Sequence, residues 1–288
     1  MLVSVGELML TCAAVMAAGC GRLGFDASDA IDAPLGPFGQ PHLIPQFSSA
    51  LPEAEPSVTG DGLELVFRRR LPPANDDLFL STRSTIADAW GDPVPMTELN
   101  TANAEGAPGI ASDGLTLWFS SNRPGGIGAI DIYVTTRRDR ASSWSMPLPV
   151  VEVDTTANDT KPCVSSDGLV MFLDNAAPLH QIKRSKRESP TSPWSFPELV
   201  SELDLAELEG GAQPFSSLEL VFSATLGGQW DIFHARRASP PEPYTVLEPM
   251  IELNTAFTEF DPWVSLDGHM VVFGSTRSGN EELYEATR

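Results

Sequence analysis

Residues 108–137 read PGIASDGLTLWFSSNRPGGIGAIDIYVTTR. After the opening proline come a Ser-Asp-Gly turn and two short apolar runs, which flank a glycine-rich loop. β-Branched and aromatic runs bounded by turn residues predict two antiparallel strands. The loop PGGIG could instead cradle a phosphate, but such a cradle leads into a helix N-terminus, and here the strand-like run DIYV follows directly. We therefore interpret these glycines as shaping a hairpin loop.

The same phrase recurs along the chain. Its copies are 48–54 residues apart and begin at Pro56, Pro108, Pro162, Pro214 and Pro262. Each copy is followed by a second short strand such as DIYVTTR, and four are then followed by an aromatic-led segment such as WSMPLPVVEVDT from Trp144. A period of about 50 residues with about four short strands in each unit is typical of β-propeller blades.

The order of the copies predicts a closed ring. The fifth unit reaches Arg288 without an aromatic-led segment, and an orphan copy, FGQPHLIPQFSS, lies ahead of the first unit from Phe38. In a closed ring the two ends complete one blade together and leave no open sheet edge, whereas a linear solenoid would need no displaced strand. The sequence thus predicts an all-β, five-bladed propeller over residues 38–288. Each blade would be a four-stranded antiparallel sheet, and an N-terminal strand would complete the last one.

The run from Ser112 to Val134 resembles the TolB-like, WD-type (PD-type) propeller repeat of bacterial envelope proteins. The pairing of SNRPGG with a following W-x-x-P and L-N-T resembles repeats found beside peptidoglycan-associated outer-membrane domains. The resemblance covers residues 38–288, although the fourth unit lacks the Asp-Gly turn and the third replaces the DIY strand with QIK. It implies the fold strongly and the function weakly, since propellers bind, scaffold and catalyse. In the Tol system a related propeller docks an envelope lipoprotein.

The first twenty residues, MLVSVGELMLTCAAVMAAGC, have the layout of a secretory signal. The terminal AAGC resembles the bacterial lipoprotein cleavage box, which implies lipidation of Cys20. Residues 21–37 are small, acidic and Pro/Gly-bearing, and we expect a flexible tether there. Plain secretion and a transmembrane anchor are the alternatives, but the apolar segment is short and carries Glu7. We expect an exported protein of the cell envelope that touches the outer membrane through a lipid anchor only and faces the periplasm or the cell surface.

Charge and cysteine content exclude several classes of protein. Lys and Arg number 18 against 39 for Asp and Glu, a formal net charge of −21. Such a surface repels phosphate backbones, so a nucleic-acid partner is not expected, and cations or basic partners are favoured. Two of the three cysteines lie in the first twenty residues, which excludes a disulfide framework. We interpret Cys163, in an apolar run, as an inert core residue.

Two sets of carboxylates repeat with the blades. In the tight turns, Asp caps its own turn and the next Gly supplies the positive φ; these aspartates are Asp61, Asp113, Asp167 and Asp267. A second set lies six residues after the apolar residue that opens each L-N-T-like segment, just before the innermost strand: Glu53, Glu105, Asp159, Glu209 and Glu259. Symmetry predicts that this second set forms a ring near one mouth of the central channel. The ring would either lock the blades by hydrogen bonds or bind a cation or basic ligand.

Signatures of catalysis are few. The sequence contains no G-x-S-x-G, H-E-x-x-H or C-x-x-C motif, and its four histidines occupy unrelated positions in the repeats. Because the acids repeat with the blades whereas catalysis needs unlike acid and base environments, the sequence favours a non-catalytic, monomeric scaffold. It would bind an envelope protein, a peptide or a glycan, with no cofactor except a possible divalent cation.

The alternative is a glycan hydrolase or lyase that uses carboxylates of the channel, since five-bladed propellers include glycosidases. A channel that holds an asymmetric cluster of two or three acids with a basic neighbour would favour this enzyme. A symmetric, internally bonded ring would favour the scaffold.

Overall fold

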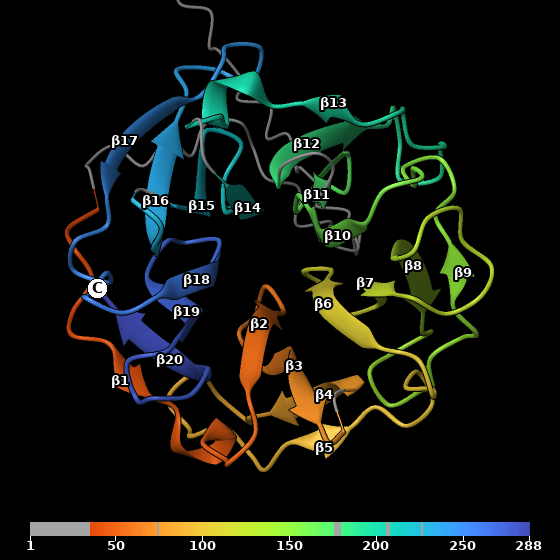
Figure 1. Ribbon diagram of the computed structural model, residues 1–288, viewed down its shortest axis with the longest axis horizontal. Helices are drawn as coiled ribbons and strands as arrows, with labels where there is room; N and C mark the ends of the chain where they lie inside the picture. The colour runs from red at the N-terminus through yellow and green to blue at the C-terminus, as the bar shows by residue number, and fades with distance from the viewer. Residues whose placement is uncertain (1–34, 74, 176–179, 206–207, 226) are drawn as a thin grey trace, which may run out of the picture. The chain divides into compact units, whose positions relative to one another are not determined.

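The computed structural model describes residues 35–73, 75–175, 180–205, 208–225 and 227–288, which belong to one compact unit, Leu35–Arg288. Five four-stranded antiparallel sheets are arranged in a ring (Figure 1). The predicted all-β, five-bladed propeller is therefore confirmed. The predicted signal segment and Cys20 lie outside the described residues. No helix in this part of the chain is long and apolar enough to cross a bilayer.

The strands of each blade follow one another from the centre of the ring outward (Figure 1). The first blade contains β2 (Glu53–Val58), β3 (Glu64–Leu71), β4 (Asn75–Thr82) and β5 (Val94–Pro95). The second contains β6 (Glu105–Ile110), β7 (Thr116–Ser121), β8 (Asp131–Thr136) and β9 (Leu148–Pro149). The third contains β10 (Asp159–Val164), β11 (Val170–Asn175), β12 (Gln181–Lys186) and β13 (Glu198–Leu199). The fourth contains β14 (Glu209–Pro214), β15 (Glu219–Thr225), β16 (Trp230–Arg236) and β17 (Thr245–Pro249).

The fifth blade joins the two ends of the unit. It consists of β18 (Glu259–Val264), β19 (Met270–Ser275), β20 (Glu282–Thr287) and, from the other end of the unit, β1 (His42–Leu43). His42 pairs with Glu285 in antiparallel register, and the N–H of Gly39 donates to the carbonyl of Thr287 at 2.8 Å. The ring is closed by the N-terminal strand, as predicted.

Apolar side chains fill the spaces between neighbouring blades. At the junction of the fifth and first blades, for example, Trp263 and Leu283 pack with Phe67 and Trp90. Two short 3-10 helices, η1 (Pro45–Phe47) and η2 (Ser201–Leu203), each contribute one buried side chain, Phe47 and Leu203. Because each core cluster draws residues from two blades, the packing that stabilises one blade also holds its neighbour.

An arginine at the end of the third strand stacks on an aromatic ring in every blade. The guanidinium carbon lies 4.1–4.5 Å from the ring centroid, within the range of a cation–π contact. The pairs are Arg83–Trp90, Arg137–Trp144, Arg187–Trp194, Arg237–Tyr244 and Arg288–Phe38. Each Nε also donates to a carbonyl of the turn between the first two strands, at 2.6–2.8 Å. The aromatic residues that open the fourth strands are therefore parts of the blade framework.

Candidate functional site

The four Asp-Gly turns join the first and second strands of their blades. Each Asp Oδ1 accepts a hydrogen bond from the N–H two residues later, at 2.8–3.2 Å, and each following glycine has φ between +72° and +74°. These aspartates are Asp61, Asp113, Asp167 and Asp267. In the fourth blade the hydroxyl of Ser216 accepts the N–H bonds of Leu218 and Glu219 instead. All these bonds lie inside the turns.

The PGGIG loop folds onto a carboxylate of its own blade. Asp131 Oδ1 accepts the N–H bonds of Ile127 (2.9 Å) and Gly128 (2.7 Å). A Cβ at Gly126 would lie 2.0 Å from Asp131 Oδ2, and one at Gly128 would lie 2.2 Å from the carbonyl oxygen of Ala157. The glycines therefore let a tight hairpin loop close around Asp131, in agreement with the hairpin interpretation.

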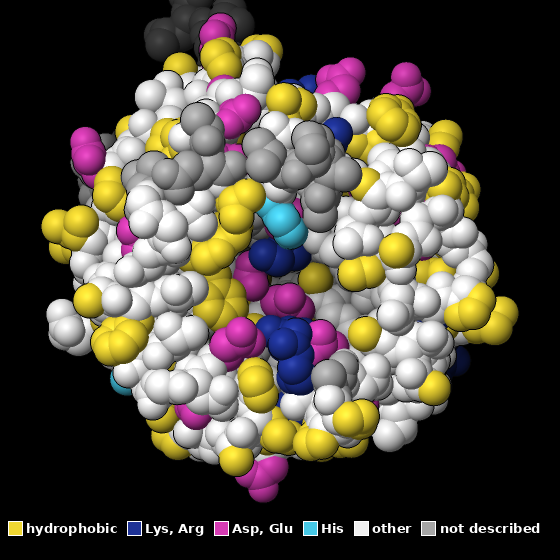
Figure 2. Space-filling model, viewed as in Figure 1, with side chains coloured by type: hydrophobic (Ala, Val, Ile, Leu, Met, Phe, Trp, Pro, Cys, Tyr) yellow, Lys and Arg dark blue, Asp and Glu magenta, His cyan; other side chains and the backbone are white. Residues whose placement is uncertain are grey.

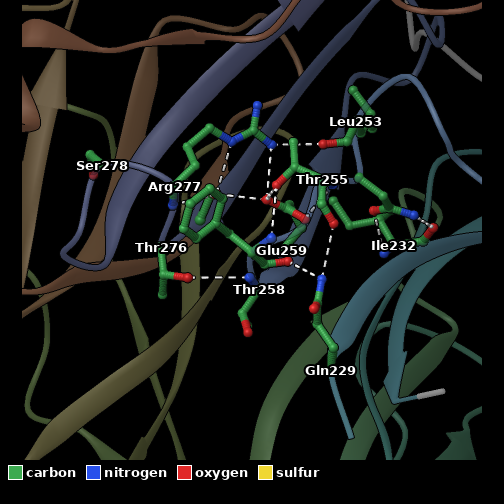
Figure 3. Close-up of polar contacts among 12 residues, drawn as sticks. Gln229, Ile232, Leu253, Thr255, Thr258, Glu259, Thr276, Arg277 and Ser278 are labelled. Carbon is green, nitrogen blue, oxygen red and sulfur yellow. Dashed lines mark hydrogen bonds and ion pairs between the residues drawn. The ribbon is translucent and has the colours of Figure 1, made fainter. Parts of the chain in front are cut away.

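The predicted ring carboxylates are the first residues of the five innermost strands, and each is at most 2% exposed. Glu259 accepts hydrogen bonds from the N–H (2.9 Å) and the hydroxyl (2.7 Å) of Thr255, from Ser275 Oγ (2.9 Å) and from Arg277 (3.1 Å). Figure 3 shows Glu259 between Thr255 and Arg277. All these partners belong to the fifth blade or to the loop that leads into it. The carboxylate thus fastens a loop to its own blade.

The other four positions have similar bonding. Glu105 contacts Thr101, Ser121 and Arg123 in the same way as Glu259 contacts its partners. Further contacts are Asp159 with Thr155 and Asn175, Glu53 with Ser49 and Arg69, and Glu209 with the N–H of Leu205. Among the described residues, no group of three or more His, Cys, Asp or Glu side chains is arranged to hold a metal ion. The ring positions are therefore internally bonded, blade by blade.

A different set of five residues faces the channel. The third residue of every innermost strand has a positive φ, between +46° and +65°, and the strand pairing shifts register there. Such a β-bulge redirects a side chain, and all five residues line the central cavity: Glu55, Ala107, Lys161, Gly211 and Asp261. A left-handed backbone costs a non-glycine residue about 1–2 kcal/mol. Strain of this kind is concentrated at functional sites.

A second set of equivalent positions lies on the second strands, next to the bulges. Ser120 Oγ accepts the N–H of Lys161 (3.2 Å), Asp174 accepts that of Gly211 (3.0 Å), and Ser223 Oγ accepts that of Asp261 (2.9 Å). Each of these bonds joins one blade to the next. The equivalent residue of the first blade, Arg68, has no acceptor atom, and there Glu55 Oε2 accepts the N–H of Ala107 (2.6 Å).

Because the residues at these positions differ between blades, they form two clusters of charged side chains. Lys161 Nζ lies 2.7 Å from Asp261 Oδ1 and 3.6 Å from Asp174 Oδ2. The guanidinium of Arg68 lies 3.3 Å from Glu55, 3.3 Å from Asp76 and 2.9 Å from Glu281.

Acidic and basic side chains gather in the hollow at the centre of the face shown in Figure 2. The channel therefore holds an asymmetric cluster of acids with two cations.

Burial raises the pKa of two of these carboxyl groups. The pKa of Asp174 rises to about 7 through burial and the nearby charge of Asp261, although Lys161 opposes the change. Burial also raises the pKa of Glu55, against the attraction of Arg68. Carboxyl groups in unlike surroundings can take unlike protonation states at one pH.

The cavity between these groups has a volume of about 40 Å³. That is room for about three water molecules and not for a sugar ring. Lys161 Nζ lies 5.8 Å from the ring centroid of Trp230. Burial and the charge of Lys161 lower the pKa of His180, whose Nδ1 is buried without a hydrogen-bond partner among the described residues. Cys163 also lines the cavity, and burial raises the pKa of its thiol to about 12.

The predicted ring positions carry a carboxylate in every repeat, whereas the residues that face the channel do not. Glu55, Lys161 and Asp261 occupy one repeat position whose residue differs in each blade. The sequence does mark this channel-facing position, because it lies two residues after each ring carboxylate and precedes a proline in four of the five repeats. The bulge that turns this residue into the channel was not predicted, so its importance was missed.

No family model matches the sequence, and the search of curated proteins finds no match. Solved structures do match the fold. TolB from Acinetobacter baumannii aligns with a TM-score of 0.53 at 15% identity, over 84% of this chain and 55% of that one. The fold is a TolB-like β-propeller. This chain thus spans about half the length of that TolB.

Glycoside hydrolases also match the TolB-like propeller. The catalytic domain of the GH62 α-L-arabinofuranosidase from Coprinopsis cinerea aligns with a TM-score of 0.61 at 12% identity, over 87% of this chain and 96% of that one. An α-L-arabinofuranosidase from Lactobacillus brevis aligns with a TM-score of 0.57 at 12% identity, over 85% and 92% of the two chains. At these identities the likeness establishes the fold.

These findings correct the prediction of a non-catalytic scaffold, which was wrong. Several glycoside hydrolases match over most of both chains, which favours the alternative, a glycan-active enzyme. A putative TolB from Agrobacterium tumefaciens also matches over 83% of this chain and 79% of that one. The physical error was to treat the repeated, blade-bonded carboxylates as the acids of the channel. The acids that line the channel, Glu55 and Asp261, do not repeat, and their surroundings differ as catalysis requires.

Proposed function

We propose that this protein hydrolyses glycosidic bonds at the mouth of the central channel. The observation that carries the proposal is the pair Glu55 and Asp261. Both project from bulges of neighbouring strands, β2 and β18, into the same water-sized cavity. One carboxyl group lies beside Arg68 and the other beside Lys161. Hydrolysis of glycosides by two carboxyl groups needs such a pair in unlike environments.

Glu55 is the proposed general acid. Its side chain is 20% exposed, and its raised pKa favours a carboxyl group that still holds a proton to donate to the leaving-group oxygen. Asp261 is the proposed general base, because the ammonium of Lys161 at 2.7 Å favours its charged form. A water molecule in the cavity between them would give a proton to Asp261 and attack the sugar. Asp174, whose side chain is 1% exposed, supports Lys161 from behind and does not meet the substrate.

The substrate class follows from the cavity and the charge. Since about 40 Å³ holds water but no sugar ring, the sugar would lie over the mouth, beside Glu55 and Trp230. With Glu55 protonated as the acid, the carboxylates Asp76, Asp261 and Glu281 still outnumber the two cations, and a negative mouth stabilises the positive charge that develops on the sugar in the transition state. Because the matching hydrolases include α-L-arabinofuranosidases, α-L-arabinofuranosides are the first substrates to test.

The test is turnover of a panel of 4-nitrophenyl glycosides, α-L-arabinofuranoside included, and of arabinose-substituted xylan. We expect Glu55→Gln and Asp261→Asn to lower kcat/KM by about 100-fold or more, the usual contribution of a general acid or base. Glu188→Gln removes an exposed carboxylate outside the channel and is expected to leave turnover unchanged. Absence of turnover by the unmodified protein across the panel, or full activity of both channel variants, would contradict the proposal.

We further propose that the protein is exported and held at the outer membrane by a lipid on Cys20. The support is the apolar segment that ends in AAGC and the acidic, Pro/Gly-bearing run after it. In this location the substrate would be an envelope or extracellular glycan. Mass spectrometry of the mature protein from a bacterial host tests the proposal, and a cleavage away from Cys20 would overturn it.

A further inference from the structure

Lys161 reaches across the channel from the third blade to the fifth. Its ammonium is the only cation within 4 Å of Asp261 among the residues that the structure describes. Asp261 is 8% exposed, and its Oδ1 has no other hydrogen-bond donor within the described ranges. A buried carboxylate with a single ion-pair partner depends on that partner for its charge.

The fourth blade leaves room for this contact. Its equivalent residue is Gly211, and a Cβ there would lie 2.8 Å from Asp261 Oδ1. A side chain at this position would therefore displace the Asp261 carboxylate from its present position. In the second blade the equivalent residue, Ala107, is also small. Gly211 and Ala107 are the two smallest of the five residues at this repeat position.

Asp174 holds Lys161 from the other side. It comes from β11 of the same blade as Lys161, its Oδ2 lies 3.6 Å from Nζ, and it also accepts the N–H of Gly211. The backbone of Lys161 is fixed too, because its N–H donates to Ser120 at 3.2 Å. Lys161 is thus held at its backbone by Ser120 and at its ammonium by the two aspartates, of which Asp261 is the nearer.

We propose that Lys161 is a positioning residue that keeps Asp261 ionised and oriented as the base. This inference rests on the proposed hydrolase function, in which Asp261 takes the proton of water. Lys161 Nζ lies 2.7 Å from Asp261 and 3.6 Å from Asp174, so the ammonium interacts more strongly with the Asp261 carboxylate. The charged and titratable groups that face this pair are Asp174, Glu55 and His180. The neutral ring of Trp230 lies on a further side.

The experiment follows the carboxyl ¹³C signals of aspartate-labelled, full-length protein through a pH titration, with Asp261 assigned by loss of its signal in Asp261→Asn. In Lys161→Met we expect Asp261 to take up its proton at a pH higher by about one to three units than in the unmodified protein. Lys161→Arg keeps the charge and is expected to keep most of the original titration. Lys186→Met, an exposed lysine of the same blade, is the matched control and should change nothing.

The same variants are then assayed for the pH dependence of kcat/KM, whose acidic limb should move upward in Lys161→Met by the same amount as the titration of Asp261. An unchanged titration of Asp261 in a folded Lys161→Met protein would overturn the proposal. If Lys161→Met does not fold, Lys161→Gln is titrated in its place with the same criterion. If the unmodified protein hydrolyses no glycoside, the proposed function fails alone, because the titration still decides whether Lys161 controls Asp261.

Discussion

At the scale of single residues, Asp154 differs from its counterparts in the second and fifth repeats of the L-N-T-like segment, which are asparagines. Asn100 and Asn254 occupy the same repeat position, and each pairs through its amide with both backbone groups of one residue in the third strand, at 2.8–3.0 Å. Asp154 accepts the N–H of Ile132 (2.9 Å), but its other oxygen is buried without a described partner. Burial, opposed by the Ile132 bond and aided by neighbouring carboxylates, raises the pKa of Asp154 to about 7.

We predict that Asp154→Asn stabilises the protein above pH 7. Asp154 binds its proton more tightly when folded, with a pKa of about 7 against about 3.9 when unfolded, so its contribution to stability is present below about pH 4 and is lost as the pH rises through 7. The asparagine supplies a permanent donor and removes this loss, a gain of about 2–4 kcal/mol at pH 8. Urea unfolding of the variant and the unmodified protein at pH 5 and pH 8 measures this difference in the free energy of unfolding. A gain that is the same at both pH values would contradict the account, and Asp92→Asn, on the surface, is the control.

At the scale of secondary-structure elements, each bulged innermost strand contributes both to the packing of its blade and to the candidate site. Its first residue fastens the blade, and its third residue points into the channel. The repeats reveal the first role, because the same carboxylate recurs five times. They conceal the second, because the residue changes from blade to blade while the backbone conformation stays the same.

Strand number, blade count and ring closure could be predicted from period and turn chemistry alone. The contact between Lys161 and Asp261 could not be predicted, because it joins blades that are not neighbours. It also depends on a β-bulge that the repeated residue types do not predict. The acids that line the channel could therefore be identified only once the register of the strands was known.

Gly211 provides a test of the bulge. We predict that Gly211→Ala lowers turnover at least tenfold, because the new Cβ would lie 2.8 Å from Asp261 Oδ1. Gly228→Ala is the matched control. Gly228 also has a positive φ, of +90°, but its Cβ would meet nothing within 4 Å. Both variants carry a backbone strain of about 1 kcal/mol. The midpoint temperature of thermal unfolding should therefore fall in both, while only Gly211→Ala loses activity. Equal losses of activity would show that strain alone matters.

At the scale of the whole folded unit, stability depends on closing the ring. The closing blade is held by the pairing of β1 with β20 and by Arg288, which stacks on Phe38 at 4.1 Å and donates to the carbonyl of Gly36 at 3.0 Å. Elsewhere the same arginine–aromatic pair joins segments that are close in sequence, such as Arg237 and Tyr244. At the closure it joins the two ends of the unit.

We therefore predict that Phe38→Ala releases β1, whereas Tyr244→Ala does not. Each variant removes a buried aromatic ring and should lower the free energy of unfolding by about 3–5 kcal/mol. Hydrogen exchange separates them: the amides of Gly39 and Ile44, which donate to β20, should exchange faster in Phe38→Ala only. Equal protection of peptides covering residues 38–47 in both variants would contradict a special role for the closure.

The pairing of His42 with Glu285 also fixes the order of events during biosynthesis. Among the described strands β1 is made first and its partner β20 last. At about 5–20 residues per second, β1 waits about 10–50 s for that partner to emerge from the ribosome. Blades with consecutive strands can form while translation continues, but the last blade cannot. The ring can therefore close only after β20 has been made, later than any of the other four blades can form.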